Sequence, residues 1–562
     1  MPTLQFKGKA AIWNHHLSVP YHTLEEDRKL HYKPEKGDGN LIIEGDNLLA
    51  LKALLPQYAG KIKCIYIDPP YNTGKEHWVF NDNVNSPLIK EWIGKEVGKD
   101  DLTRHDKWLC MMVPRLKLLR ELLADDGVIF ISIDDNENHN LRSVMDEIFM
   151  EENFLSQFIW KSDGNFDNQA RIKYCHEYIL AYCREIDKFP HPSAIDPNTP
   201  QTSKLFKDEI RNTIVKNGPG NPISTIQLPP GFPAAFTKGK IEKHSSTWPH
   251  YLNTAVIMDG LLTNEVAIES GWSSKDLILA FIGNDCMPIL DRKGQETIFE
   301  ITENGTIEVI KKRSENQSHV LSVLQNLGNT QSTSAMLKQW GVTFKFPKPI
   351  PLIKYLISMS ATSPDSIILD SFAGSGTTMH AVMELNKEDG GNRKCILVQM
   401  TEADEKDPKK NICKDITRER VKRAIDKNGY ESGFRYLRVG QPIDAETMLA
   451  GNLPSYKDFA KYVYYLCTGQ HLPDEKSIVE KEFFVGLTGK TGIYLIYKKD
   501  PDALSSMALN LSQAEAMRSR HPEGRLVVYA PACFLDEEYM REHGIEFVSI
   551  PYGMFTKTGE RA

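Results

Sequence analysis

A buried strand that ends in Asp-Pro-Pro-Tyr constrains the fold of this chain more than any other feature. Residues 62–67 are rich in apolar, β-branched and aromatic side chains, and Asp68, Pro69, Pro70 and Tyr71 follow directly. The strand must end there, because the two prolines remove backbone donors and fix φ. We therefore expect Asp68 and Tyr71 to lie in a stiff loop at the carboxyl end of a strand, which is where open α/β sheets bind their ligands.

The groups in this loop suit a planar heterocycle that carries an exocyclic amine. The Asp68 carboxylate and the Pro69 carbonyl can accept both amine hydrogens, and the Tyr71 ring can stack on the heterocycle. A plain turn after a strand is the alternative interpretation, since this tetrapeptide arises by chance in roughly one chain in several hundred. A second, independent motif is needed to decide between the two.

A glycine loop between a predicted strand and a predicted helix supplies that motif. Residues 367–369 indicate the strand, and the spacing of apolar residues in 379–385 indicates the helix. Met379 stands where a dinucleotide site has glycine, and no lysine follows the second glycine as in a phosphate-binding loop. A methionine-derived cofactor fits better than NAD or ATP, and a side chain at Gly374 or Gly376 is predicted to block it with little change in fold.

A third polar segment follows the predicted strand 41–43. It reads Glu44-Gly45-Asp46-Asn47 and precedes a helical pattern in residues 48–55. Taken alone, Asp46 is best interpreted as the N-cap of that helix, because Asp and Asn are favoured at this position.

Along the chain the segment at 44–47 comes first, the Asp68 loop second and the glycine loop last, with a long insert between the last two. In that order the three motifs resemble the β-class amino-methyltransferases of DNA, and most closely the modification subunits of type III restriction–modification systems and their stand-alone relatives. The matching segments span most of residues 35–184 and 345–430. The resemblance implies an α/β fold with a seven-stranded, mostly parallel, Rossmann-like methyltransferase sheet. It also implies a circular permutation that places the catalytic half before the cofactor half.

The resemblance assigns Asp68, Pro69, Pro70 and Tyr71 to catalysis, and S-adenosyl-L-methionine as the cofactor. It places Asp46 against the adenine of the cofactor and residues 346–349 over its methionine end. The family often has an acid that holds the ribose at the end of the strand after the glycine loop, where this chain has Gln399; Glu402 could act instead. The predicted cofactor residues are Asp46, Asn47, Asp370, Phe372, Ala373, Gly374, Ser375, Gly376, Thr377 and Gln399.

The implied activity is site-specific methylation of the N6 amine of an adenine flipped out of double-stranded DNA, as expected of a restriction–modification or related defence system. Cytosine N4 presents the same amine geometry, although the related cytosine enzymes usually have Ser in place of Asp68. RNA or protein glutamine as substrate, and an inactive DNA-binding relative, are further alternatives. Methyl transfer needs no metal, so Asp134 and Asp135 are interpreted as a polar strand end.

Composition limits the partners of the chain. Its 562 residues include 68 Lys+Arg and 75 Asp+Glu, a net charge of −7, so attraction to DNA must come from local basic patches. We expect a cytoplasmic protein, because no long apolar run or leader pattern occurs and the nine cysteines show no C-x-x-C spacing. The resemblance implies a homodimer, and any cleavage would need a separate restriction subunit, since no helicase or nuclease motif is present.

Changes in composition divide the chain and single out an insert that is predicted to select the DNA sequence. In the insert, Asn304-Gly305 between two alternating runs indicates a β-hairpin. Residues 485–491 look like a phosphate-binding loop, but a strand follows them, so a hairpin turn is expected. Basic clusters comprise Lys238, Lys240 and Lys243, and Lys311, Lys312 and Arg313, of which the second is predicted to contact phosphates. The predicted parts are an N-terminal extension (1–34), the catalytic half (35–184), the target-recognition insert (185–345), the cofactor half (346–430) and a small C-terminal α/β domain (431–562).

Overall fold

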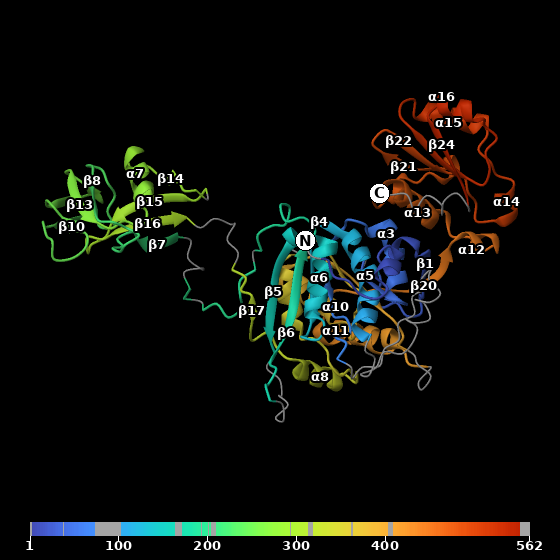
Figure 1. Ribbon diagram of the computed structural model, residues 1–562, viewed down its shortest axis with the longest axis horizontal. Helices are drawn as coiled ribbons and strands as arrows, with labels where there is room; N and C mark the ends of the chain where they lie inside the picture. The colour runs from blue at the N-terminus through green and yellow to red at the C-terminus, as the bar shows by residue number, and fades with distance from the viewer. Residues whose placement is uncertain are drawn as a thin grey trace. The chain divides into compact units, whose positions relative to one another are not determined.

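The computed structural model describes residues 3–37, 39–73, 103–162, 171–192, 194–200, 202–203, 209–292, 294–312, 319–360, 363–402 and 409–550 (Figure 1). The chain forms two compact units, Met1–Ala194 together with His319–Ala562, and Ile195–Ser318. The predicted insert of residues 185–345 is therefore too long at both ends. One reason is that β17 (Val323–Leu324) pairs with β5 (Phe154–Lys161) of the first unit.

A ten-stranded sheet forms the centre of the first unit, three strands more than predicted. Most neighbours are parallel, as expected; the antiparallel pairs are β1 with β20, β4 with β6, and β6 with β5. In spatial order the strands are β1 (Tyr21–Glu26), β20 (Arg435–Ile443), β2 (Leu41–Glu44), β19 (Lys394–Gln399), β18 (Ile367–Asp370), β3 (Ile62–Ile67), β4 (Leu123–Ile133), β6 (His176–Cys183), β5 and β17.

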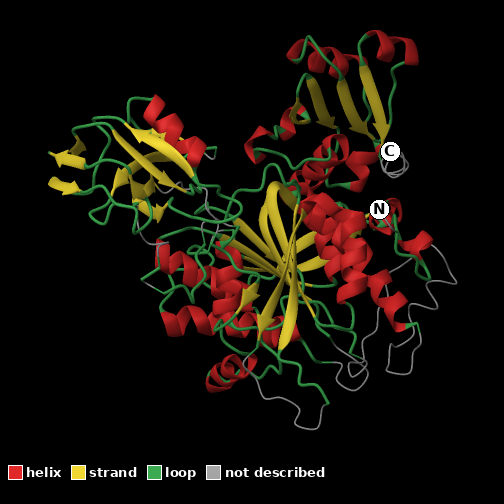
Figure 2. Ribbon diagram, turned by 60° about the vertical axis from the view of Figure 1, so that its left-hand side comes forward, coloured by secondary structure: helices red, strands yellow, loops and turns green. Residues whose placement is uncertain are grey.

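Helices cover both faces of this sheet, as Figure 2 shows. Alternate residues of the central strands enter two separate cores; in β3, Ile65 belongs to one core, and Cys64 and Tyr66 to the other. Burial on both faces explains why these strands read as continuous apolar runs. The first core contains α3 (Asn47–Tyr58), α5 (Arg104–Leu122) and α6 (Asn138–Phe149), and the second contains α9 (Ile350–Ser358), α10 (Thr377–Asp389) and α11 (Glu419–Asn428).

The edge strands correct two predicted boundaries. The N-terminal residues 1–34 are not a separate extension, because β1 belongs to the sheet and α1 (Lys9–Ile12) and α2 (His15–Ser18) pack on α5. A boundary at residue 431 is also wrong, because β20 pairs in parallel with β2. These strands extend the sheet beyond the predicted seven.

The second unit, Ile195–Ser318, is rich in short antiparallel strands around its own core, which includes Phe232, Tyr251 and Phe299. The predicted hairpin is confirmed, since β15 pairs with β16 and Gly305 has φ +75° between them. Its elements are β7 (Glu209–Thr213), β8 (Ser224–Leu228), β9 (Lys238–Ile241), β10 (His250–Tyr251), β11 (Ala255–Met258), β12 (Leu261–Leu262), β13 (Val266–Ser270), α7 (Lys275–Gly283), β14 (Ile289–Leu290), β15 (Glu296–Ile301) and β16 (Ile307–Lys312).

The last part of the chain carries a four-stranded sheet in the order β21-β22-β23-β24. Thr488 pairs with Thr491, so the segment that resembles a phosphate-binding loop is a hairpin turn, as predicted. Tyr465 of α13 donates to Glu121 over 2.6 Å, which ties this part to α5. Its elements are α12 (Ala445–Leu449), α13 (Tyr456–Thr468), β21 (Phe484–Thr488), β22 (Thr491–Leu495), α14 (Pro501–Ser505), α15 (Leu511–Arg520), β23 (Leu526–Ala530), α16 (Glu537–Glu542) and β24 (Ile545–Ser549).

Among the helices that the structure describes, none combines the length and the apolar character needed to cross a membrane.

Candidate active site

The two predicted motifs meet at the carboxyl ends of neighbouring parallel strands. Asp68 follows β3, Asp370 ends β18, and these strands pair directly, with Leu369 opposite Ile65. Each loop leaves its strand at the same edge of the sheet, because parallel strands share one direction. The sheet therefore brings together the loop predicted to bind the amine and the loop predicted to bind the cofactor.

Lys348 joins the catalytic loop to two carboxylates. Its Nζ lies 2.9 and 3.0 Å from the two oxygens of Asp68 and 3.1 Å from Glu177 Oε2. It also donates to Tyr71 Oη over 2.8 Å, and that hydroxyl in turn donates to Glu177 over 2.8 Å. Pro347 and Pro349 flank Lys348 just before α9, which restricts the backbone that carries the ammonium. Residues 346–349, which were predicted to cover the cofactor, thus place the Lys348 ammonium in the catalytic loop.

Burial and charge act against one another in this cluster. Burial raises the pKa of Asp68, and the nearby Lys348 ammonium offsets only part of this rise. Burial alone would lower the pKa of Lys348, but Asp68 and Glu177 hold it above its usual value. The Lys348 side chain is 10% exposed and that of Asp68 25%, so the carboxylate still faces the outside. At neutral pH, an ammonium between two carboxylates leaves one negative charge for an incoming group.

Two residues outside the catalytic loop, Trp108 and Glu137, hold it in place through hydrogen bonds. The indole Nε1 of the fully buried Trp108 donates to the Pro70 carbonyl over 2.6 Å. Asn72 has a left-handed backbone, φ +58°, and its amide donates to the buried Glu137. Glu137 also contacts His105 Nδ1 at 2.6 Å. The carbonyl held by Trp108 belongs to Pro70, not to Pro69, which was expected to accept from a substrate.

The polar residues of the glycine loop largely hold the loop itself. The Gly374 N–H donates to Gln399 Oε1 over 2.7 Å, and the Gly374 carbonyl accepts from Thr417 over 2.6 Å. Asp370, 2% exposed, accepts from the Phe372 N–H over 3.0 Å and from Thr378, and burial raises its pKa to about 7. Asp370 therefore shapes the loop from inside the protein.

Gln399 is also fully engaged, while Glu402 faces outward. Besides accepting from Gly374, Gln399 donates its amide to Glu402 Oε1 over 2.9 Å. Glu402 is exposed and has φ +56°. A hydrogen bond from Gln399 thus orients a carboxylate next to the glycine loop.

The glycine loop leaves less room for side chains than predicted. Gly374 and Gly376 have φ +51° and +82°, so both need left-handed backbone. A Cβ at Gly376 would lie 3.2 Å from methyl groups of Thr417 and Val421, and one at Gly374 would lie 3.3 Å from Phe344. A larger residue at Gly376 would press on Thr417 and Val421, so we now expect it to disturb the packing of α11 as well as cofactor binding.

Asp46 is the N-cap of α3, as predicted from sequence. It accepts from the Leu48 and Leu49 N–H groups over 2.8 and 3.3 Å. Asn47 donates to the Ser371 carbonyl over 3.1 Å, which fixes this segment to the glycine loop. The buried Arg115 of α5 bonds to Asn47 and lies 3.3 Å from Asp46.

Arg420 of α11 is a fully buried cation behind the glycine loop. Its Nη1 donates to Ser375 and, over 2.6 Å, to Thr377 Oγ1, and Thr377 donates to the Lys348 carbonyl over 3.2 Å. Burial lowers the pKa of Arg420 to about 9. Within the described chain, its Nε and Nη2 have no hydrogen-bond partner, and Gly376, the N-cap residue of α10, provides no side-chain cap. Unpaired donors at a helix N-terminus suit a ligand with a carboxylate, as S-adenosyl-L-methionine has.

Several of these residues were not predicted from sequence. Arg115 carries a visible signal, because it is a charged residue inside the apolar run of α5. Lys348 lay in a predicted segment, but its contact with Asp68 was not expected. Glu177 and Arg420 carry no signal that separates them from surface charges.

Two of the three residues predicted to contact phosphates form ion pairs within the second unit. Lys311 is paired with Asp291 at 2.6 Å and Lys312 with Glu296 at 2.8 Å, while Arg313 lies outside the described residues. The other cluster, Lys238, Lys240 and Lys243, is exposed on and after β9, and none of the three forms an ion pair with a described residue.

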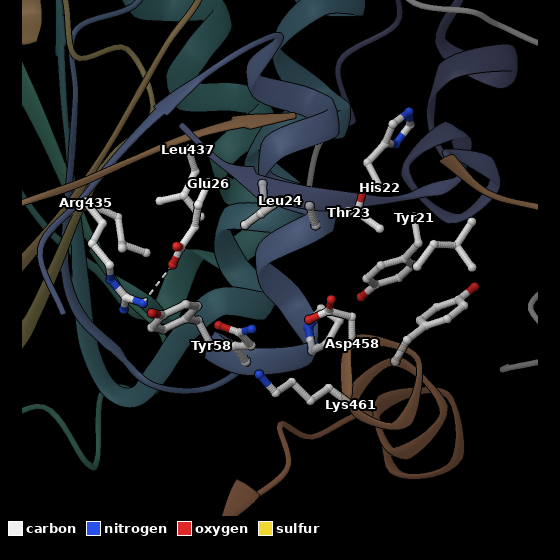
Figure 3. A pocket seen from close by; sticks show the side chains of 16 residues that line it. Tyr21, His22, Thr23, Leu24, Glu26, Tyr58, Arg435, Leu437, Asp458 and Lys461 are labelled. Atoms are coloured by element: carbon white, nitrogen blue, oxygen red, sulfur yellow. Dashed lines mark hydrogen bonds and ion pairs between the residues drawn. The ribbon is translucent and has the colours of Figure 1, made fainter. Parts of the chain in front are cut away.

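A cavity of about 220 Å³ lies away from these loops, between β1, β20, α3 and α13 (Figure 3). Its charged groups include Arg435, paired with Glu26 at 3.4 Å, and Lys461, paired with Glu475. Neither predicted motif contributes to its lining, so it is not the candidate active site.

Comparison with known proteins identifies the family of the chain. Residues 62–426 match a family model described as DNA methylase. The Mod subunits of the type III restriction–modification enzymes EcoP15I from Escherichia coli and EcoPI from Escherichia phage P1 are 31% and 32% identical; each alignment covers 75% of this chain and 69% of the relative. Among solved structures, the cytosine-N4-specific PvuII DNA methyltransferase is 12% identical with a TM-score of 0.31, over 70% of this chain and 93% of that one. The chain belongs to the DNA methylase family.

Proposed function

We propose that the protein is a site-specific methyltransferase that modifies the N6 amine of adenine in double-stranded DNA. The observation that carries the proposal is the Asp68 carboxylate at the end of β3, next to the glycine loop and partly open to the outside. We also propose that it acts in a restriction–modification system with a separate restriction subunit. The similarity to the two Mod subunits supports this role.

The residues of the catalytic loop act on the amine. A base must leave the duplex before its amine can reach a buried carboxylate. Asp68 and the Pro69 carbonyl accept the two amine hydrogens and draw the nitrogen lone pair out of conjugation, while Tyr71 stacks on the ring. The net negative charge of the Asp68, Glu177 and Lys348 cluster stabilises the positive charge that develops on nitrogen. S-adenosyl-L-methionine supplies the methyl group.

The glycine loop and its supports hold that cofactor. Arg420, Ser375 and the N-terminus of α10 face its carboxylate in the proposal, and Gly374 and Gly376 keep the loop in its left-handed shape. Glu402, oriented by Gln399, accepts from the ribose hydroxyls. The proposal keeps Asp46 and Asn47 near the cofactor's adenine, with Arg115 fixing both.

The remaining assignments concern the architecture and the partners. The catalytic strand β3 precedes the cofactor strand β18 in the chain, which supports the permuted order. Residues 195–318 are proposed to recognise the DNA sequence, with the exposed Lys238, Lys240 and Lys243 as phosphate contacts. A homodimer is proposed because two copies would allow one to read the site while the other modifies it.

Nucleoside analysis tests the base and the activity together. DNA from cells that express the protein is digested to nucleosides, which are separated by chromatography and identified by mass spectrometry. We expect N6-methyladenine, and none when Asp68 is replaced by alanine. Adenine is proposed as the base because the chain has Asp68 where the related cytosine enzymes usually have Ser. Detection of N4-methylcytosine instead would overturn this choice of base. Absence of both methylated nucleosides would favour the inactive relative.

A further inference from the structure

The Lys348 ammonium lies where the target amine is proposed to bind. It contacts both oxygens of Asp68 and lies 5.0 Å from the centre of the Tyr71 ring, the ring proposed to stack on the base. A target amine that donates a hydrogen bond to Asp68 needs at least one of those two oxygens. The ammonium and the base amine therefore compete for Asp68.

Glu177 offers the ammonium a second place. Its Oε2 lies 3.1 Å from Lys348 Nζ, and Tyr71 Oη lies 2.8 Å from the same nitrogen. A small rotation about the lysine side chain can release Asp68 while both of these contacts remain. The ammonium then stays inside the site, so its charge is not lost when the base enters.

We infer that Lys348 is a positioning residue that takes the place of the target amine on Asp68 before the base arrives, passes to Glu177 when the base enters, and keeps Asp68 ionised throughout. This inference rests on the proposed function. It does not depend on whether the amine belongs to adenine or cytosine, because both present the same donors.

The charges around Asp68 explain why an ammonium is needed. The groups that face it are Glu177 on β6, the hydroxyls of Tyr66 and Tyr71, and Asp370 on β18, while Asp134 at the end of β4 faces Glu177. All of these are acidic or neutral, and Lys348 is the cation that the described residues place on Asp68. Without it, Asp68 and Glu177 would be two like charges in a shielded site, and such pairs retain a shared proton. A protonated Asp68 accepts from an amine poorly.

The pH dependence of single-turnover methyl transfer tests this inference. The rate is measured with tritiated cofactor and saturating DNA from pH 5.5 to 9. The proteins are the wild type, Lys348→Met, Lys348→Arg, Glu177→Gln and the double variant Lys348→Met with Glu177→Gln. Lys345→Met is the matched control, because Lys345 is exposed in the same segment. Thermal denaturation and cofactor calorimetry establish that each variant is folded.

We expect Lys348→Met to lower the rate at least tenfold at pH 7, and we expect the rate of this variant to recover as the pH rises. The acid limb of its pH–rate profile, where the rate falls at low pH, should lie at least one pH unit above that of the wild type. Glu177→Gln should move the acid limb down, since it removes a like charge. The double variant should return the limb to the wild-type position, and Lys348→Arg, which keeps the charge, should leave it there.

Two results would overturn the inference: an equal loss in Lys348→Met at every pH, or a limb that stays shifted in the double variant. If Lys348→Met does not fold, Lys348→Arg and the double variant decide between the same outcomes. A wild-type protein that transfers no methyl group to any DNA would instead refute the proposed function, and the inference with it.

Discussion

Replacing Lys238, Lys240 and Lys243 by alanine should flatten the salt dependence of DNA binding. All three side chains are exposed, and Lys238 and Lys240 lie on the same face of β9. Each phosphate contact contributes about −0.9 to the slope of log K against log salt, so three contacts contribute about −2.7. Between 50 and 200 mM salt, a slope of that size changes affinity by roughly 40-fold.

Fluorescence anisotropy with a labelled duplex measures the slope directly. The matched control is Lys311→Ala with Lys312→Ala, because these lysines have the same charge but are paired with Asp291 and Glu296. We expect the triple variant to lose most of the contribution of about −2.7 that the three lysines make to the slope. The control variant should have the slope of the wild type. An unchanged slope in the triple variant, or a flattened one in the control, would refute the argument from ion pairing.

Three other substitutions test the site. Asp68→Ala should abolish methyl transfer while calorimetry with S-adenosyl-L-methionine gives a near wild-type affinity; an equal loss of both would contradict the division between the two loops. Tyr71→Ala should weaken binding of the extruded base by about 1–3 kcal/mol, and unchanged turnover would remove Tyr71 from the site. Gly376→Val should lower the melting temperature more than Gly390→Val, because both glycines are left-handed but only Gly376 has neighbours within 4 Å; equal losses would show that backbone strain alone acts.

The position of the two loops was predictable because each follows an apolar run that can only be an interior strand. Asp68 and Asp370 mark the ends of these runs, and the structure pairs the strands side by side. The N-cap role of Asp46 and the Asn304-Gly305 hairpin were predictable for a different reason, because local backbone preferences decide them.

Contacts between distant segments were not predictable. Lys348 and Asp68 are 280 residues apart, and nothing local to either residue indicates that they meet. The pairing of Lys312 with Glu296 depends on the register of β15 and β16, which the sequence leaves open. The end of the insert was misplaced because β17 has only two residues, too few to show a periodic pattern.

The two points where the chain leaves and rejoins the sheet have an evolutionary consequence. The chain departs after β6 and returns at β17, and β5 pairs with both of these strands. The parallel strands that carry Asp68 and the glycine loop lie further into the sheet and are not interrupted. Recombination near residues 195 and 318 could therefore exchange the intervening unit between relatives in one step. If this unit selects the DNA sequence, as proposed, such an exchange gives a new sequence specificity and leaves the two catalytic loops unchanged.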